Sequence, residues 1–556
     1  MNNKLHILLI IFIFGVAAFL RLYQLTNVPP SLYWEEVAVG YDAYSLLKTG
    51  KDHHDAVWPI IAIKSFGDWK PTGYFYALLP SLALFGLSDF AVRLPNALAG
   101  VLIVIGVAVL ARKLHLNGLW ALAVAAISPW AIQFSRSMWE ANFATSLLVW
   151  GVIGVFTAKH QWKLKRKTWI LAAVGSALLF VAAGYTYHAA RVIAPILCLS
   201  SVIFVYRDLV VRQFSATIKI SGIILGTCFI LYVPLFLKAS SPELSHRFQE
   251  TSIFGDAAII EMSNALREQS DMTMFSRIIY HRYVLYSQVI LENAVSHFSP
   301  TYMFLRGDEN IRHSTHFAGL FYIFESVFLG LGFIYLWNKN KAASVFLLIW
   351  LLVTLFPAAL TKAVPHALRT LPSMPVFILY ITAGITSFLE IARKKKVANH
   401  AVVLLIFAYS ISSLQYLRYY FLIYPKVSND EWQYGYTQMI SELNSLEREL
   451  PEYPVYVSRI EGRPAMYYWF YSKTDPRRVQ TASKTAMFDQ GEFLTFENKS
   501  FYREIPQLSE SSIIAAAPEE VSKFESLNPD YQFTPLKTVS NLSDTVVWQL
   551  LVAEEK

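Results

Sequence analysis

Residues 5–44 read LHILLIIFIFGVAAFLRLYQLTNVPPSLYWEEVAVGYDAY, and this stretch decides the fold class. Residues 5–23 form an apolar run long enough to cross most of a bilayer as a helix. A Pro29-Pro30 break follows, and residues 31–44 then mix aromatic with acidic side chains. Such a mixture suits a helix in the membrane interface better than a solvated loop. The stretch therefore predicts a membrane anchor followed by a helix at the bilayer surface.

The composition is that of an integral membrane protein. Of the 556 residues 54% are hydrophobic and 16% are charged, whereas soluble domains carry about 25% charged residues. The two cysteines, Cys198 and Cys228, lie inside apolar runs, so we expect no disulfide framework. The first apolar run has no small-residue cleavage site after it, which indicates an uncleaved signal anchor. Walker A, dinucleotide-binding and G-x-S-x-G sequences do not occur, so nucleotide-driven chemistry lacks support.

Eleven apolar runs have about the length that a membrane-spanning helix requires. Two pairs among them are separated only by short polar turns, and a re-entrant pair would lower the count by one or two. The runs lie near residues 5–23, 91–111, 117–134, 142–158, 168–187, 189–206, 218–237, 317–337, 343–360, 372–392 and 399–423.

Alternate loops between these runs differ in charge. One set is basic, with Asp208 as its only acid, and the other set holds nearly all the acids. By the positive-inside rule we expect a multi-pass protein with a cytoplasmic N-terminus. The long loops 24–90 and 238–316 and the C-terminus are then extracytoplasmic. This topology accounts for the net charge of +8 without a nucleic-acid partner. The basic loops contain Arg112-Lys113, 159–167, Arg207 and Arg212, Lys339 and Lys341, and 393–396.

The chain is predicted to have two domains. Residues 1–425 form the transmembrane domain, and loop 24–90 reads as two interfacial helices around polar turns at 52–55 and 67–71. After Pro425 the composition becomes that of a soluble domain, which we expect to be a small extracytoplasmic α/β domain over 426–556. A helix is predicted over 433–450, and strands are predicted over 454–458, 512–517 and 545–551.

Glu35 and Glu36 are the first candidates for chemistry. Two neighbouring carboxylates repel each other, and a partly desolvated position at the membrane makes one of them a suitable general base for an acceptor hydroxyl. Adjacent helical residues point about 100° apart, so only one of the two can face a given substrate. The alternative is a pair of solvated acids that the helix dipole favours in the first turn. The sequence leaves both assignments open.

Further charged and imidazole groups interrupt the apolar sequence on the predicted outer side. Several cations with several carboxylates on one face suit a site that binds a phosphate and removes a proton. Arg136 and Glu140 are also spaced for a simple salt bridge within a helix. Adjacent His53 and His54 cannot readily share a metal, so we assign no metal ligands there. No cofactor is required by the predicted chemistry, and the sequence leaves a divalent metal open. The substrate-binding candidates are Asp68, Lys70, Arg136, Glu140, His188, Arg191, His366 and Arg369.

The order of these motifs resembles the GT-C superfamily of polyprenyl-phosphate-sugar-dependent glycosyltransferases. Within it, the chain is most similar to the bacterial branch related to protein O-mannosyltransferases and the aminoarabinose transferase of lipid A. The resemblance spans residues 1–425 and is most specific in 21–142. It rests on Arg21-Leu22, the acidic pair, Gly-Asp-x-Lys-Pro at 67–71, Ala-Val-Arg-Leu-Pro at 91–95, Ser-Pro-Trp-x-x-Gln-Phe-Ser-Arg at 128–136, and later motifs at 306–315 and 366–370.

The resemblance implies an all-α polytopic GT-C fold and transfer of a sugar from undecaprenyl or dolichyl phosphate with inversion. It assigns the base to Glu35, although the family more often has Asp there, so Glu36 stays open. It places Lys70 at the lipid phosphate and Arg136 and Glu140 near donor and acceptor. The remaining cations, His188, Arg191, His366 and Arg369, are assigned more loosely to phosphate or sugar contacts.

We therefore predict an inverting membrane glycosyltransferase of the bacterial cell envelope, with its active site at the extracytoplasmic face. Its partners are a polyprenyl-phosphate-linked sugar, membrane lipids, and a protein, lipid or envelope polymer as acceptor. Three alternatives remain at the level of sequence. They are a transporter or flippase of lipid-linked sugars, a ligase that transfers a whole lipid-linked oligosaccharide, and a non-catalytic assembly protein.

Overall fold

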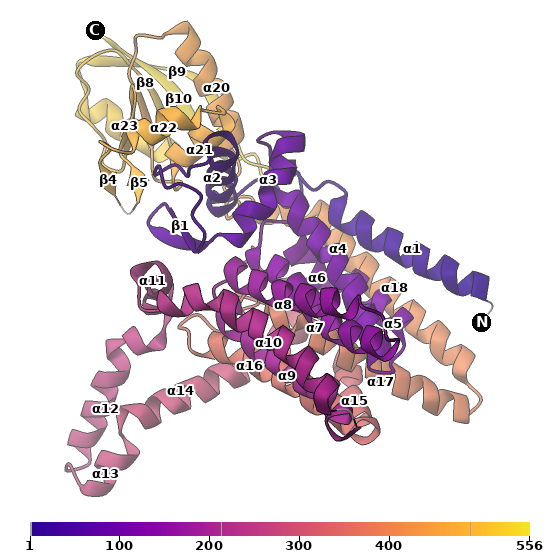
Figure 1. Ribbon diagram of the computed structural model, residues 1–556. Helices are drawn as coiled ribbons and strands as arrows, with labels where there is room; N and C mark the ends of the chain where they lie inside the picture. Colours follow the sequence, from indigo (N-terminus) through magenta and orange to yellow (C-terminus); the bar gives the residue numbers. More distant parts are fainter. Residues whose placement is uncertain (1–2, 213, 490) are drawn as a thin grey trace. The chain divides into compact units, whose positions relative to one another are not determined.

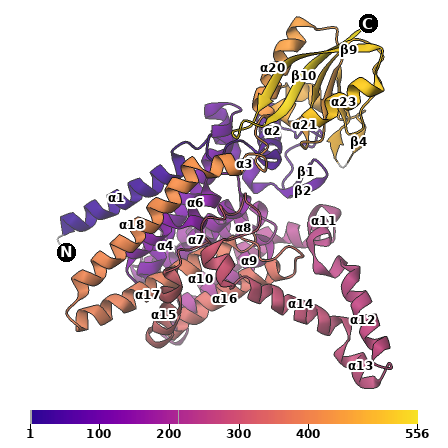
Figure 2. The same ribbon diagram turned by 180° about the vertical axis from the view of Figure 1, so that it is seen from behind.

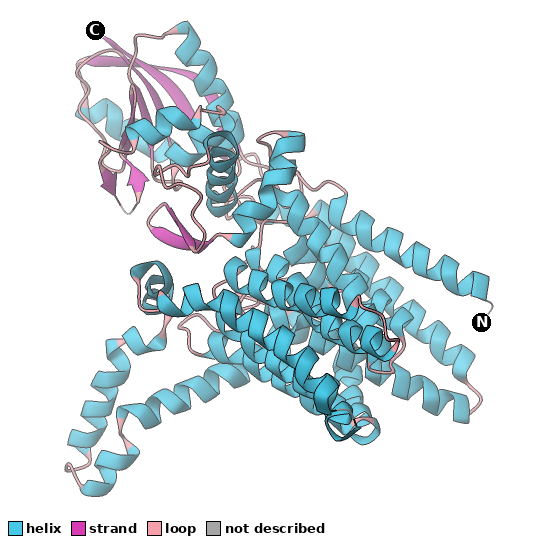
Figure 3. Ribbon diagram, viewed as in Figure 1, coloured by secondary structure: helices cyan, strands magenta, loops and turns pink. Residues whose placement is uncertain are grey.

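The computed structural model describes residues 3–212, 214–489 and 491–556. Its contacts divide the chain into two compact units, and neither unit is continuous in sequence. The first, here called the helical unit, consists of Met1–Tyr23 and Asn96–Leu417. The second, here called the mixed unit, consists of Gln24–Pro95 and Arg418–Lys556. Among the described residues, all named strands belong to the mixed unit (Figure 3). The predicted domain boundary at residue 425 stays a prediction.

The helical unit is built from long apolar helices joined by short loops (Figure 1). Helices α7 to α10 lie side by side, and α15 packs on α17. The helices of the unit are α1 (Asn3–Leu22), α4 (Asp89–Lys113, which enters from the mixed unit), α5 (Gly118–Ile127), α6 (Pro129–Ser135), α7 (Glu140–Lys163), α8 (Trp169–Thr186), α9 (Ala190–Arg212), α10 (Phe214–Leu237), α15 (Glu325–Lys339), α16 (Lys341–Ala359), α17 (Met374–Lys394) and α18 (Ala398–Leu422, which leaves to the mixed unit).

Nine helices in the described part of the chain are long and apolar enough to cross a membrane. Helices α5 and α6 form a tenth candidate, bent by 59° where Pro129 follows Ser128. The eighth of the eleven expected spans, 317–337, is helical only from Glu325, and α15 has 15 residues. The protein is thus a multi-pass membrane protein with nine or ten candidate spans. Apolar side chains of α1 and α18 are largely exposed, as on helices whose outer faces contact lipid.

Residues 242–305 form an arm on the helical unit (Figure 2). Helices α12 and α13 lie at its end, beside α14 and away from the long apolar helices of this unit in both views. The arm contains α11 (Pro242–Thr251), η1 (Ile253–Gly255), α12 (Ala257–Gln269), α13 (Met274–Ile279), α14 (Arg282–Ser296) and η2 (Thr301–Leu305). Outside the arm, the short helix η3 (Leu371–Ser373) lies between α16 and α17.

The first part of the mixed unit holds α2 (Trp34–Thr49), the hairpin β1 (Ala62–Ser65) and β2 (Asp68–Pro71), and α3 (Gly73–Phe85). Helix α2 begins at Trp34, and Tyr33 is its N-cap residue. The turn expected around Gly67 is a two-residue hairpin turn in which Phe66 and Gly67 both have positive φ. Both central residues of a type I′ turn need this conformation.

The second part of the mixed unit contains a six-stranded sheet of order β6-β7-β3-β8-β10-β9. Strand β3 is parallel to both β7 and β8, and β10 is antiparallel to both β8 and β9. The strands predicted at 454–458, 512–517 and 545–551 correspond to β3, β8 and β10. The elements are α19 (Tyr424–Val427), α20 (Tyr436–Glu449), β3 (Val455–Ser458), α21 (Pro464–Tyr471), α22 (Pro476–Ala482), β4 (Phe488–Asp489), β5 (Glu492–Phe493), β6 (Thr495–Phe496), β7 (Lys499–Tyr502), β8 (Ser512–Ala516), α23 (Pro518–Leu527), β9 (Tyr531–Ser540) and β10 (Val546–Glu555).

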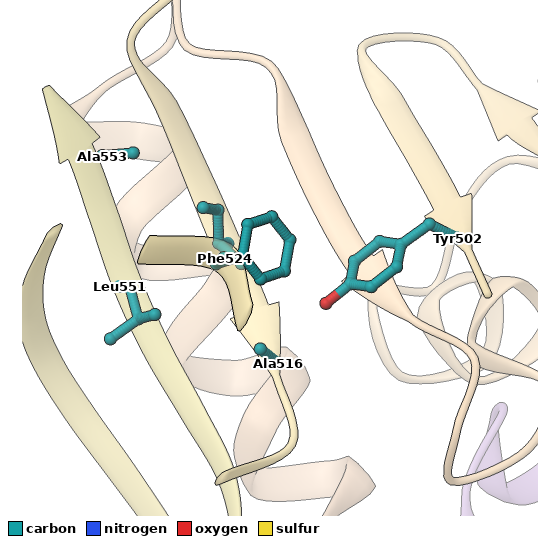
Figure 4. Packing of buried hydrophobic residues seen from close by; sticks show 6 residues of the cluster. Tyr502, Ala516, Phe524, Leu551 and Ala553 are labelled. Carbon is teal, nitrogen blue, oxygen red and sulfur yellow. The ribbon is translucent and has the colours of Figure 1, made fainter. Parts of the chain in front are cut away.

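One apolar core of the mixed unit lies between this sheet and α23 (Figure 4). Phe524 of α23 is fully buried and its ring meets the ring of Tyr502 edge to face, with centroids 5.4 Å apart. Leu551 and Ala553 of β10 and Ala516 of β8 belong to the same cluster. Burial of these side chains is the main source of stability for such a layer of helix on sheet.

A buried acid in the mixed unit gives the stability of the protein a pH dependence. Glu492 accepts a hydrogen bond from the Ala465 N–H at 3.0 Å through Oε1, and its buried Oε2 has no partner among the described residues. Burial raises the pKa of Glu492 to about 8 from its usual value near 4.5. The folded protein therefore keeps this proton at pH values where the unfolded chain has lost it.

We expect the free energy of unfolding to fall as the pH rises from about 5 to 8, and Glu492→Gln to weaken this dependence because the amide stays neutral. Thermal unfolding midpoints at pH 6 and pH 8, followed by tryptophan fluorescence in detergent, measure the effect. The exposed Glu525→Gln of α23 is the control and should behave as the wild type. An unchanged pH dependence in Glu492→Gln would contradict this prediction.

Candidate active site

The structure separates the roles of the two adjacent carboxylates. Glu36 is fully buried and forms a two-pronged ion pair with the equally buried Arg93. Arg93 Nε donates to Glu36 Oε1 at 3.0 Å, and Arg93 Nη2 donates to Oε2 at 2.9 Å. The Tyr33 N–H also donates to Oε2, at 3.3 Å, which joins the carboxylate to the start of α2. Both oxygens of Glu36 are therefore engaged in holding the structure.

Arg93 connects this pair to the loop that precedes α2. Its Nη1 donates to the carbonyl oxygens of Leu25 and Pro29 at 3.0 and 2.8 Å, and its Nη2 also donates to the Ser31 carbonyl. A guanidinium carries five N–H groups in a fixed fork, and here one side chain joins five acceptor atoms. Sequence reasoning quoted Arg93 within Ala-Val-Arg-Leu-Pro but assigned no role to it.

Glu35 lies on the more open side of α2. About a third of its side chain, 32%, is exposed, and its Oε2 accepts a hydrogen bond from the Tyr33 hydroxyl at 3.1 Å. Its Oε1 lies 3.8 Å from the Nζ of Lys70, whose side chain is mostly buried. A carboxylate in the first turn of a helix is also favoured by the helix dipole. Glu35 and Lys70, which the sequence singled out separately, are thus neighbours within the mixed unit.

The β1–β2 hairpin sets the position of Lys70. Lys70 is paired with Ile63 across the ladder, and Asp68 begins β2 opposite Ser65. The Asp68 carboxylate accepts a hydrogen bond from the Trp69 N–H at 2.7 Å. Two short strands joined by a tight turn have a fixed register, so the ammonium group is carried by ordered backbone rather than by a loop.

The C-terminal residues of the mixed unit hold α2 in place. The Trp34 N–H donates to Gln433 Oε1 at 2.9 Å, and the Tyr467 hydroxyl donates to the Leu32 carbonyl at 3.1 Å. Further along the helix, the Tyr41 hydroxyl donates to the Thr474 carbonyl at 3.0 Å. The helix that carries Glu35 therefore depends on residues about 400 positions away in the chain.

Sequence reasoning did not foresee the buried pair of His53 and Asp42. Asp42 Oδ1 lies 2.5 Å from His53 Nδ1 and also accepts from the His53 N–H at 3.2 Å. The imidazole stacks on Phe66 at the hairpin turn, with ring centroids 4.9 Å apart. Burial opposes protonation of His53, but the charge of Asp42 outweighs it and raises the pKa of the imidazole. The pair fixes the loop after α2 against the helix itself.

In the helical unit, Arg136 is fully buried in the turn between α6 and α7. Its guanidinium donates to the carbonyl oxygens of Leu20 and Tyr23, both at 2.6 Å. These carbonyls lie at the end of α1, where a cation also complements the helix dipole. Glu140 is the half-buried first residue of α7. The predicted pair thus lies at one turn, and Arg136 anchors α1 there.

His188 and Arg191 lie at the junction of α8 and α9. Arg191 Nη1 is 3.2 Å from His188 Nδ1. The buried Nε and Nη2 of Arg191 have no hydrogen-bond partner among the described residues. Buried donors are normally paired, so an unpaired guanidinium face points to an anionic ligand or water. Of the predicted cations, Arg191 offers the clearest free hydrogen-bonding capacity in the described part of the chain.

Arg369 lies close to the same junction. Its Nη1 donates to Thr361 Oγ1 at 2.6 Å and to the Ala363 carbonyl at 3.1 Å. Burial raises the pKa of Tyr187, and the negative charge of Glu140 raises it further. The positive charges of Arg369 and Arg247 partly oppose this rise. Arg369, Glu140 and Arg247 are thus electrostatic neighbours of Tyr187. Tyr187 and Arg247 are therefore further candidates that the sequence did not single out.

His366 belongs to a different cluster of the helical unit. Its Nδ1 lies 3.7 Å from Asp308 Oδ2, and the Nδ1 of His313 lies 3.3 Å from the same oxygen. Burial disfavours ionisation of Asp308, but His313 and His366 outweigh it and lower the pKa of the carboxyl to about 2. The imidazole of His313 packs against the rings of Trp139 and Phe134. The cluster thus borders the turn that carries Arg136.

Comparisons with solved structures find the same fold over almost the whole chain. The match to ArnT from Cupriavidus metallidurans bound to undecaprenyl phosphate has a TM-score of 0.52 and 12% sequence identity, and covers 99% of this chain and 98% of that chain. This protein has a GT-C fold. The apo state of that ArnT matches with a TM-score of 0.53 and 12% identity over 100% and 98% of the two chains.

An oligosaccharyltransferase from Archaeoglobus fulgidus, tethered to an acceptor peptide, also matches. Its TM-score is 0.50 and its identity is 14%, over 85% of this chain and 63% of that chain. No protein-family model and no curated protein matches the chain. At identities of 12% to 14% these comparisons establish the fold alone.

The buried ion pair gives a test of the structural role of Glu36. Removal of one partner leaves a buried charge without compensation, so we expect Glu36→Gln to destabilise the mixed unit by about 3–5 kcal/mol. Denaturant or thermal unfolding in detergent measures the change. The matched control is Glu497→Gln, which breaks a two-pronged pair with Arg478 on the surface of the same unit. That control should cost less than about 1 kcal/mol. Equal losses in the two variants would contradict the assignment.

Proposed function

We propose that this protein is an inverting glycosyltransferase that moves a sugar from a polyprenyl-phosphate carrier to an acceptor hydroxyl. The single observation that carries the proposal is the arrangement on α2. Glu36 is locked by Arg93, whereas Glu35 is partly exposed beside the ammonium group of Lys70. One available carboxylate with one neighbouring cation is the minimum that base-assisted displacement of a phosphate leaving group requires.

In the proposed reaction, Glu35 accepts the proton of the acceptor hydroxyl. The acceptor oxygen forms a bond to the anomeric carbon while the bond from that carbon to the phosphate oxygen breaks. The electron pair of the broken bond stays on the polyprenyl phosphate, which leaves as an anion. Lys70 stabilises the charge that grows on the phosphate. A phosphate is a good leaving group, so no protein acid is needed to protonate it.

The helical unit supplies groups that suit contacts to the phosphate or the sugar of the donor. Arg191 has two buried guanidinium nitrogens without partners among the described residues, and Arg369, Glu140 and Arg247 are electrostatic neighbours of Tyr187. Unpaired guanidinium groups bind phosphate oxygens in a planar fork. We assign Arg191 and Arg369 to the donor, and Glu140 to the donor or the acceptor. The imidazole of His366 lies beside the carboxylate of Asp308, and we assign it no contact to the sugar donor.

The fold supports this function by analogy. The match to an ArnT structure with bound undecaprenyl phosphate makes a polyprenyl phosphate the first carrier to test. The distribution of basic residues in alternate loops favours an extracytoplasmic site.

The class of reaction is tested with purified protein in nanodiscs, labelled undecaprenyl-phosphate-linked sugars, and a membrane extract as the source of acceptors. We expect polyprenyl phosphate to be released and label to enter the acceptor fraction. Glu35→Gln should lower this rate at least about 100-fold, because a general base contributes on the order of 10²–10⁴. Glu497→Gln, at an exposed pair far along the sequence, serves as the control with unchanged rate.

Other results would favour the alternatives. Movement of intact donor across liposomes without cleavage would support a flippase. Transfer only of a multi-sugar chain would support a ligase. Unaltered transfer by Glu35→Gln would remove the base from the proposal while keeping the class of reaction.

The orientation in the membrane has a separate test. We expect alkaline phosphatase fused after Lys556 to be active in cells, because the C-terminus is predicted to be extracytoplasmic. The same reporter fused after Lys396, in the basic loop between α17 and α18, should be inactive. The opposite pattern would reverse the assigned topology and with it the face on which the acceptor must lie.

A further inference from the structure

Asp308, His313 and His366 direct ligand atoms toward one another in the helical unit. We propose that these three residues bind a divalent transition-metal ion, with Zn²⁺ as the best match. One ligand atom from each residue lies within 4.8 Å of the other two, and all three side chains are buried or largely buried. This cluster is distinct from the His53-His54 dipeptide, at which the sequence predicts no metal.

The distances fit metal coordination better than hydrogen bonding. Zinc binds imidazole nitrogen and carboxylate oxygen at about 2.0–2.2 Å, so neighbouring ligands of a tetrahedral ion lie about 3.4 Å apart. Asp308 Oδ2 is 3.3 Å from His313 Nδ1 and 3.7 Å from His366 Nδ1. Both distances exceed the range of about 2.7–3.2 Å for an N–H···O hydrogen bond. Both Nδ1 atoms are buried without a hydrogen-bond partner among the described residues.

The backbone around the cluster holds the carboxylate in a fixed orientation. Asp308 Oδ1 accepts from the Asn310 N–H at 2.9 Å, and Oδ2 accepts from the Ala367 N–H at 2.6 Å. Hydrogen bonds of this kind to a ligand carboxylate are the usual support of a metal site. They also join the loop that contains Asp308 to the loop that contains His366.

The turn that carries Asp308 and His313 is tightly constrained. The Ser314 hydroxyl donates to the Arg306 carbonyl at 2.7 Å and closes the turn. Gly307 has φ +81°, and a Cβ at this position would lie 2.2 Å from Ser314 Oγ. Only glycine fits there without a rearrangement. The sequence Arg-Gly-Asp-Glu-Asn-Ile-Arg-His at 306–313 is therefore explained as a turn that presents two ligands.

His297 supports the third ligand without being one itself. Its Nδ1–H donates to the Asn293 carbonyl at 2.7 Å, and its Nε2 accepts the His366 N–H at 3.2 Å. Both ring nitrogens are thus used, and the imidazole fixes the backbone of His366. A residue that holds a ligand in this way normally affects metal affinity about 10–100-fold.

The ligand set selects the class of ion. Two imidazoles and one carboxylate suit Zn²⁺ and related transition metals, whereas Mg²⁺ and Ca²⁺ prefer sites made of oxygen alone. Three protein ligands leave a fourth position for water or another oxygen ligand. The ion would cross-link the loop after η2 to the loop between α16 and α17. Since His313 packs on Trp139 and Phe134, the cross-link would also steady the turn of Arg136.

The experiment measures metal binding rather than activity, so it is independent of the proposed function. Full-length protein without a polyhistidine tag is stripped with EDTA, and Zn²⁺ is titrated against a chromogenic chelator. The wild type should bind one equivalent tightly. Asp308→Asn, His313→Gln and His366→Gln should each weaken binding at least about 100-fold, and His297→Gln by about 10-fold. His400→Gln, at an exposed histidine in α18, should leave the affinity unchanged.

A second measurement needs no variant and therefore does not depend on how well the variants fold. X-ray absorption at the zinc edge of the wild type should show two imidazoles and oxygen ligands in the first shell. Failure of the stripped wild type to bind one equivalent of Zn²⁺ would overturn the proposal. Tight binding that survives in both His313→Gln and His366→Gln would also overturn it, because the ion would then lie elsewhere.

Discussion

The buried ion pair between Glu36 and Arg93 is the interaction on which the rest of the mixed unit depends. Two charges removed from water are costly, and they are tolerated here because every oxygen and most N–H groups find partners. The pair fixes the start of α2 relative to the loop that leaves α1. It also determines which of the two adjacent acids, Glu35 or Glu36, can take part in chemistry. A carboxylate in a bidentate ion pair with a guanidinium cannot also serve as a base.

The second constraint is the dependence of α2 on the C-terminal sequence. Gln433, Tyr467 and Thr474 bind the backbone or side chains of α2 and of the residues before it. The six-stranded sheet behind them is covered by α23 and α20, so the helix rests on a layered core rather than on loops. A reactive group on such a support is held with less freedom than a group on a loop. This gives the C-terminal residues a definite structural role.

Local patterns in the sequence predicted much of this architecture. Long apolar runs became long helices, and the short apolar runs at 512–517 and 545–551 became strands of the central sheet. Contacts between residues that are far apart in the sequence could not be predicted from such local patterns. Arg93 and Glu36 are 57 positions apart, and Asp308 and His366 are 58 apart, so no spacing rule joins them. The bend at Pro129 and the late start of α15 likewise depend on packing that hydropathy alone does not report.

The division of labour between Glu35 and Glu36 is most directly tested by the stereochemistry of transfer. A donor of known anomeric configuration is converted by the wild-type protein, and the configuration of the glycosidic bond in the product is measured by NMR. Inversion is expected, because the partly exposed carboxylate of Glu35 acts as a base in a single displacement. Retention of configuration would contradict it, since retention requires a nucleophilic carboxylate and a second acid or base, and Arg93 holds the only adjacent candidate, Glu36.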